Sequence, residues 1–189
     1  MAHVRTAARL PRSGNAALAA GALIQVALGT EFVLAGLSKA LDPDFAAHFK
    51  GFVQASPAAQ RGLLAPLLQG LVLPNAAAAA RLATFVELGA GLVLLLSALE
   101  VARRRFSGQL GKQHPYEPAV ALLSAVAAVV VGGMSATIYA IEGGGLPRIS
   151  AATAFGSPIA IELFLVPMAF GIAWLEFGRF LALRARSSA

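Results

Sequence analysis

The stretch AAAAARLATFVELGAGLVLLLSALEV, residues 76–101, decides the fold class of this chain. Its charged residues are Arg81, Glu87 and Glu100, and the rest is almost entirely apolar or small. At the α-helical rise of ~1.5 Å per residue, the stretch is longer than the ~30 Å hydrocarbon core of a bilayer. It therefore predicts a membrane-spanning helix.

Three further apolar runs, residues 16–41, 118–141 and 157–183, repeat this pattern. Of the 189 residues, 58% are hydrophobic and only 13% are charged, and the mean hydropathy is +0.73. A soluble core of ordinary proportions cannot hide so much apolar surface. We expect an all-α protein, an integral membrane four-helix bundle that forms one domain over residues 1–189.

The basic residues cluster at the ends of these runs, although the net charge of +6 by itself could indicate a nucleic-acid partner. Arg103, Arg104 and Arg105 follow the second run, and Arg184 and Arg186 follow the fourth. This clustering orients a membrane protein, so we expect no nucleic acid. The positive-inside rule predicts a multi-pass protein with both termini and the 102–117 loop in the cytoplasm.

The connection over residues 42–75 is too long for a turn and predicts two short helices in the outer interface. Asp42-Pro43 and Ser56-Pro57 each pair a capping residue with a proline suited to the first helical position. Aromatic residues share one face of the first helix: Phe45, Phe49 and Phe52. Leucines between residues 63 and 71 share one side of the second. We interpret the segment as a lid over the bundle.

Glycines recur where membrane helices approach one another closely. They occur in pairs on the first three spans: Gly29 and Gly36, Gly89 and Gly91, and Gly132 and Gly133. We expect tight helix packing there, in preference to a wide pore.

Acidic residues inside membrane spans are costly and therefore mark functional sites. Glu31 lies ten residues before Leu41, and Glu87 lies eight after Ala79. Because the first two spans run in opposite directions, both would lie ~12–15 Å below the outer boundary, where they could meet. Glu162 is shallower by about one helical turn.

Two cations accompany these acids at the outer end. Lys39 is two turns from Glu31 on a similar side of its helix, and Arg81 is at the outer end of the second span. Two carboxyl groups at one depth in a low dielectric do not both ionise easily, so at least one is expected to have a raised pKa. A proton acceptor beside a quinone needs such a raised pKa. A Glu paired with Lys or Arg can also simply hold helices in register, and this interpretation stays open.

Other polar residues predict less. His48 and His114 have no second ligand at metal-binding spacing, and the chain has no cysteine, so we expect no metal site. Neither paired histidines for haem nor cysteines for iron–sulfur clusters are present. Glu100 with Arg103 or Arg104, and Glu176 with Arg179, are expected to be ordinary solvated pairs at the cytoplasmic ends.

Short motifs in the first half of the chain resemble the DoxX/DoxD family. They are EFVLAGLSK at Glu31–Lys39, which leads into Asp42-Pro43, and VELGAGL at Val86–Leu92. VLPN at Val72–Asn75 resembles the DoxD branch in particular, the membrane subunit associated with thiosulfate:quinone oxidoreductase. The resemblance covers roughly residues 29–100.

The resemblance implies a membrane subunit that passes electrons from thiosulfate to the quinone pool and yields tetrathionate. Glu31 and Glu87 would then be catalytic and manage protons for the quinone. Lys39, Arg81 and Glu162 would bind substrate, with the two cations attracting the thiosulfate dianion. The resemblance also implies a plasma-membrane location and a periplasmic partner subunit. Because the chain shows no ligands for a redox cofactor, electrons would move directly or through that partner.

Two other functions remain open. The chain could be a non-catalytic accessory subunit that packs against a larger respiratory or redox complex through its small-residue faces. It could also carry a small molecule or a lipid in a pocket beneath the lid.

Overall fold

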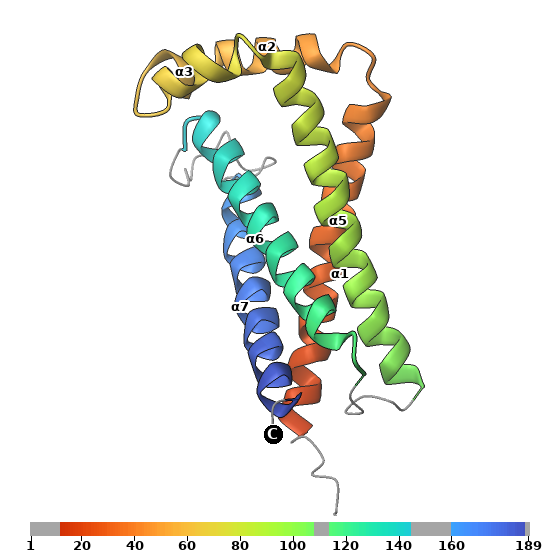
Figure 1. Cartoon of the computed structure of the whole chain (residues 1–189). Coiled ribbons are helices and arrows are strands. Elements are labelled where there is room, and N and C mark those ends of the chain that lie inside the picture. The colour runs from red at the N-terminus through yellow and green to blue at the C-terminus, as the bar shows by residue number, and fades with distance from the viewer. Residues whose placement is uncertain (1–11, 108–113, 145–159, 188–189) are drawn as a thin grey trace, which may run out of the picture.

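The computed structural model describes residues 12–107, 114–144 and 160–187, and within these ranges the chain is helical without strands. The four long helices lie side by side (Figure 1): α1 (Arg12–Leu41), α5 (Ala76–Phe106), α6 (Glu117–Ile141) and α7 (Glu162–Ser187). Short helices connect α1 to α5: α2 (Phe45–Ala55), α3 (Pro57–Gln60), α4 (Ala65–Leu67) and η1 (Leu68–Val72). The predicted all-α four-helix bundle is confirmed.

Each long helix is long and apolar enough to cross a membrane, so the chain is a membrane protein. The first and third spans end where the sequence predicts. α5 continues beyond Val101 to Phe106, because arginines favour the C-terminal end of a helix. α7 begins at Glu162, where an acidic side chain favours the N-terminal end. Residues 157–159, predicted as the start of this span, lie outside the described residues.

The bundle consists of two close helix pairs, since α1 packs mainly against α5 and α6 mainly against α7. Glycines permit this approach: a Cβ on Gly91 would lie 2.9 Å from the carbonyl oxygen of Gly29. A Cβ on Gly36 would lie 2.7 Å from the Leu88 side chain. The predicted tight packing is confirmed there and at Gly132. It is wrong for Gly89 and Gly133, which meet nothing within 4 Å.

The two pairs meet across an apolar core at the middle of the bundle. It combines buried residues of all four spans: Leu28 and Phe32 of α1, Ala90 and Leu94 of α5, Ala127, Ala128 and Val131 of α6, and Ala169, Ile172 and Ala173 of α7. We call the end where α1 begins and α7 finishes the terminal end. We call the opposite end, where α2 and α3 lie across the bundle, the capped end (Figure 1).

The capping segment differs in part from its sequence prediction. Ser56 is the N-cap of α3, as predicted, and its hydroxyl accepts the Ala59 N–H at 3.2 Å. Asp42 is not a cap, because α2 begins only at Phe45. Its carboxylate instead accepts the backbone N–H of Asp44, at 3.0 Å.

The predicted second helix is also shorter than expected. α3 ends at Gln60, and Gly62 follows with a φ of +115°, a conformation that favours glycine and turns the chain. The leucines therefore do not share one side. Leu63 is fully exposed, whereas Leu68 is buried against Val53 of α2 and its neighbours.

Candidate functional site

An ion pair between α1 and α5 is the centre of the candidate site. The ammonium group of Lys39 donates to both carboxylate oxygens of Glu87, each at 2.5 Å. The Glu87 side chain is only 3% exposed and that of Lys39 is 26% exposed. Because both residues belong to candidate spans, this is a charge pair within the membrane-spanning part of the protein.

The close packing of α1 and α5 brings these two residues together. Gly36 lies beside Leu88, which directly follows Glu87. Lys39 is three residues further along α1, so its long side chain reaches back over less than one helical turn. The pair therefore depends on the glycine-mediated register of the two helices.

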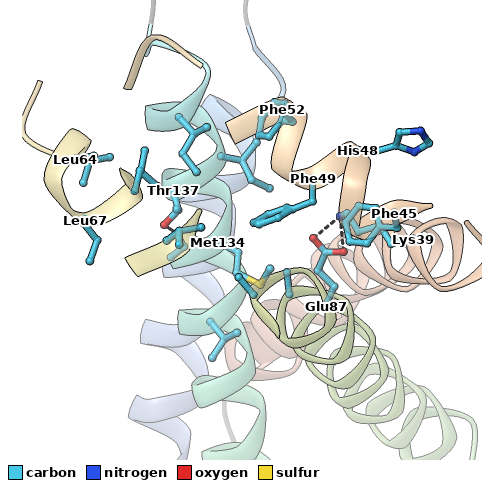
Figure 2. A pocket seen from close by; sticks show the side chains of 18 residues that line it. Lys39, Phe45, His48, Phe49, Phe52, Leu64, Leu67, Glu87, Met134 and Thr137 are labelled. Carbon is cyan, nitrogen blue, oxygen red and sulfur yellow. Dashed lines mark hydrogen bonds and ion pairs between the residues drawn. The ribbon is translucent and has the colours of Figure 1, made fainter. Parts of the chain in front are cut away.

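A cavity of about 710 Å³ lies directly beside the pair, beneath α2. Figure 2 shows Phe49 and Met134 pointing toward its centre, Lys39 and Glu87 at one side, and Leu64 and Leu67 at the other. Its walls come from α1, α2, α4, η1, α5 and α6. The residues are Lys39, Phe45, His48, Phe49, Phe52, Leu64, Leu67, Leu68, Val72, Ala79, Ala83, Glu87, Val130, Gly133, Met134, Thr137, Ile138 and Ile141.

The cavity is apolar apart from a few groups. Aromatic rings of α2 cover it, and the rings of Phe45 and Phe49 are 6.1 Å apart. Gly133 and Thr137 line the cavity and are themselves exposed, although both lie within the α6 span. The cavity therefore lies at the depth of the α6 span.

A second, exposed pair lies at the rim. Nδ1 of His48 is 2.8 Å from Oδ2 of Asp42. This hydrogen bond lowers the pKa of Asp42 and raises the pKa of His48 above its usual 6.5. The pair ties the first turn of α2 to the end of α1.

The structure does not bring Glu31 to Glu87. Glu31 is exposed on the outside of α1 and does not line the cavity. The register explains the separation, because Gly36 and not Glu31 lies at the level of Leu88. Glu31 is five residues further from the capped end, which is about 8 Å along the helix.

The remaining predicted substrate residues also lie outside the cavity lining. Arg81 is exposed near the beginning of α5. Glu162 is half-buried in the first turn of α7. Partial desolvation, and to a smaller extent the charge of Glu162, raises the pKa of Glu142, which follows α6. Of the five residues that the sequence nominates, the structure therefore assembles Lys39 and Glu87.

The sequence analysis missed a buried polar cluster at the terminal end, which we call the terminal network. Glu117 of α6 accepts from Arg104 of α5 at 2.6 Å and from Arg179 of α7 at 3.4 Å. Arg179 also contacts Glu176, at 3.2 Å. Gln25 of α1 donates to Glu176 at 2.9 Å and to Ser124 at 3.0 Å. The network thus connects all four spans.

The prediction that Glu176 and Arg179 form a solvated pair is wrong, because Glu176 is 2% exposed. Their spacing along α7 is that of a surface pair, but the helix turns Glu176 toward Gln25. The polar residue Gln25 inside an apolar run was the available signal. Glu100 and Arg103 do form an outward-facing pair, since the Arg103 side chain is 55% exposed. The predicted alternative, Arg104, is instead buried and pairs with Glu117.

Chemically, the cavity suits an amphiphile with an uncharged head group. Lys39 and Glu87 neutralise each other, so the site offers little net charge to a free ion. An ammonium has three N–H donors, and two of those of Lys39 are directed at Glu87. One N–H donor of Lys39, which lines the cavity, is therefore not engaged by Glu87.

Comparisons of the chain with protein-family models, with curated proteins and with solved structures find no match. The membership of the DoxX/DoxD family accordingly stays a prediction from the sequence motifs.

Proposed function

We propose that this protein is the membrane subunit of a quinone-linked oxidoreductase and that the cavity beneath α2 binds the quinone head group. The observation that carries the proposal is the Lys39–Glu87 pair at the wall of an otherwise apolar cavity within the spans. A charged pair is costly at membrane depth and marks a functional site.

The dimensions and chemistry of the cavity fit a quinone. Its volume of about 710 Å³ is in the range of small-molecule sites, which is ~300–1,000 Å³. Phe49 and Met134 offer aromatic and polarisable surface to a flat ring. The free donor of Lys39 would hold a quinone carbonyl oxygen, and Glu87 would hold or release a proton beside it. The quinone, when bound, supplies the electron acceptor.

The access route also fits a membrane-soluble molecule. Because Gly133 and Thr137 of the α6 span line the cavity, we expect a quinone to enter it from the bilayer, with its tail left among lipid chains. In this proposal the protein lies in the plasma membrane with both termini cytoplasmic, in line with the exposed Arg103 and Arg105 at the terminal end. The quinone then binds in the outer half.

Electrons would come from a partner subunit. Thiosulfate as the source of these electrons follows from the family resemblance alone. Arg81 lies away from the cavity, so Arg81 and Lys39 do not form a common pocket for thiosulfate. We therefore restrict the site to Lys39 and Glu87 and leave Glu31 and Arg81 outside it.

Binding of a photoreactive, short-tailed ubiquinone to the purified protein in lipid nanodiscs tests the proposal. The double variant Lys39→Met/Glu87→Leu removes both charges, and replacing a whole buried pair by apolar residues is commonly tolerated. We expect it to fold and to lose labelling by about tenfold or more, equivalent to ~1.4 kcal/mol or more. Arg105→Gln, an exposed change at the terminal end, is the matched control and should label as the wild type does.

Turnover is tested separately, as thiosulfate-dependent quinone reduction in membranes that also contain the neighbouring redox subunits. Glu87→Gln should abolish it while the protein remains in the membrane. Labelling that is unchanged in the folded double variant would contradict the proposed site.

A lipid carrier is the second candidate, because the same cavity would accept the head group of a neutral lipid. Saturable labelling by a photoreactive diacylglycerol, without competition from ubiquinone, would favour this function over the redox one.

A further inference from the structure

Glu31 has an unusual location for a carboxyl group. It is exposed on α1, ten residues before the end of the span at Leu41, so it lies about 15 Å inside the membrane-spanning part. Among the residues that the structure describes, none donates a hydrogen bond to Glu31 or forms an ion pair with it. In a membrane, this side chain would face lipid.

A lone carboxyl group facing lipid at this depth is expensive. Membrane proteins usually direct such groups toward the bundle interior, as the chain does with Glu87, Glu117 and Glu176. Glu31 differs from all three, which indicates that another surface covers it.

The residues around Glu31 form a continuous stripe on α1, which we call the outer stripe. All of its members are exposed and recur at helical spacing: Leu23, Ala27, Thr30, Glu31, Leu34, Ser38 and Leu41. Ala27, Thr30 and Ser38 are small, and small residues let membrane helices approach closely. Thr30 and Ser38 also add hydroxyl groups beside the carboxyl group.

The two cations that the sequence places near Glu31, Lys39 and Arg81, do not pair with it in the described part of the chain. Lys39 is engaged by Glu87. Arg81 is exposed, but Gly36 lies beside Leu88, and this register puts Arg81 about 18 Å from Glu31 along the membrane normal. A second copy in the same orientation keeps all depths, so its Arg81 is equally remote.

The geometry points to a second copy of this chain that packs its outer stripe against the first, with the two Glu31 side chains in contact. A two-fold axis along the membrane normal places the same residue of both copies at one depth. A carboxylic acid group can both donate and accept a hydrogen bond, so two carboxyl groups that share a proton are self-complementary across such an axis. The contact satisfies both groups without a cation.

Disulfide cross-linking in membranes tests this contact directly, because the natural chain has no cysteine. Leu34→Cys places one thiol on the outer stripe, next to Glu31 along the helix. Upon mild oxidation we expect a covalent dimer. Val126→Cys, an exposed position of α6, is the matched control and should remain monomeric.

Substitutions of Glu31 in the Leu34→Cys background test the role of the carboxyl group. Glu31→Gln keeps a donor and an acceptor and should retain the cross-link. Glu31→Leu should lower dimer formation about tenfold at limiting protein density, equivalent to ~1.4 kcal/mol. An apolar residue facing lipid does not endanger folding, so this loss is interpretable.

Three results would overturn the inference: no dimer for Leu34→Cys, an equal yield for Val126→Cys, or an unchanged yield with Glu31→Leu. Cross-linking of Leu34→Cys to a different membrane protein instead of to itself would assign the outer stripe to a heterologous partner. Ubiquinone labelling of the same variants keeps this test separate from the proposed function.

Discussion

The two ends of this bundle both bury charged side chains, but they do so in different surroundings. At the terminal end, Arg104, Glu117 and Arg179 are packed among four helices, and Glu176 and Gln25 extend the hydrogen bonds to α1. At the capped end, a single pair, Lys39 and Glu87, borders a cavity of about 710 Å³. The apolar core separates the two ends.

This difference indicates a division of roles. The terminal network contacts every span, so its charges hold the helices together. The capped-end pair joins only α1 and α5 and leaves a donor free, so its charges can serve a ligand. Buried ion pairs therefore stabilise the helix packing at the terminal end and form a candidate binding site at the capped end.

The largest effect should come from Glu117→Ala. It leaves Arg104 and Arg179 buried without their shared acceptor, and losing one partner of a buried ion pair costs ~3–5 kcal/mol. The fraction folded during titration with SDS measures this loss. Glu100→Ala, at the exposed pair of the same end, is the control and should cost a small part of that. Equal losses for both variants would contradict a locking role.

Gly91→Ala tests the register that brings Lys39 to Glu87. Its Cβ would lie 2.9 Å from backbone atoms of Gly29 and Val33, which cannot move cheaply, so we expect a loss of ~1–3 kcal/mol in the same titration. Gly89→Ala has open space and should leave stability unchanged or raise it by up to ~1 kcal/mol. If Gly91→Ala were also neutral, the close α1–α5 contact would be incorrect.

Gly133→Leu tests whether the cavity itself matters, without altering the charged pair. The position meets nothing within 4 Å and lines the cavity, so a leucine fills the space that a ligand would occupy. We expect ubiquinone affinity to fall about tenfold, ~1.4 kcal/mol, with little change in stability. Gly171→Leu, on the open side of α7, provides the control. Unchanged affinity in Gly133→Leu would place the ligand elsewhere.

The smallest effect concerns the exposed Asp42–His48 pair at the rim. Its attraction is complete between the lowered pKa of Asp42 and the raised pKa of His48. The attraction weakens as pH rises through the pKa of His48 and as pH falls through that of Asp42. An NMR titration should give a pKa of His48 above 6.5, and the Asp42→Asn substitution should return this pKa toward 6.5. No difference between the two titrations would argue against the pair.

The sequence predicted the site only in part. It nominated Lys39 and Glu87 because charged residues in apolar runs are conspicuous, but it paired Glu87 with Glu31 by counting depth from the span ends. That count ignored which face of α1 each residue occupies and how α1 and α5 are shifted by their glycine contacts. It also described Glu176 as solvated, since spacing along one helix does not reveal what the helix faces.

What the sequence by itself determined is the number of spans, their approximate limits and the all-α membrane architecture. These follow from the length and polarity of each run, which are local properties that decide whether a segment can span the bilayer as a helix. Only the tertiary structure decided which charges meet. Partnership depends on the rotation and register of four helices, set by close contacts such as that of Gly91 with Gly29. The α1–α5 contacts separate Glu31 from Glu87 and bring Lys39 to Glu87. The rotation of α7 buries Glu176, although its spacing from Arg179 implied a solvated pair.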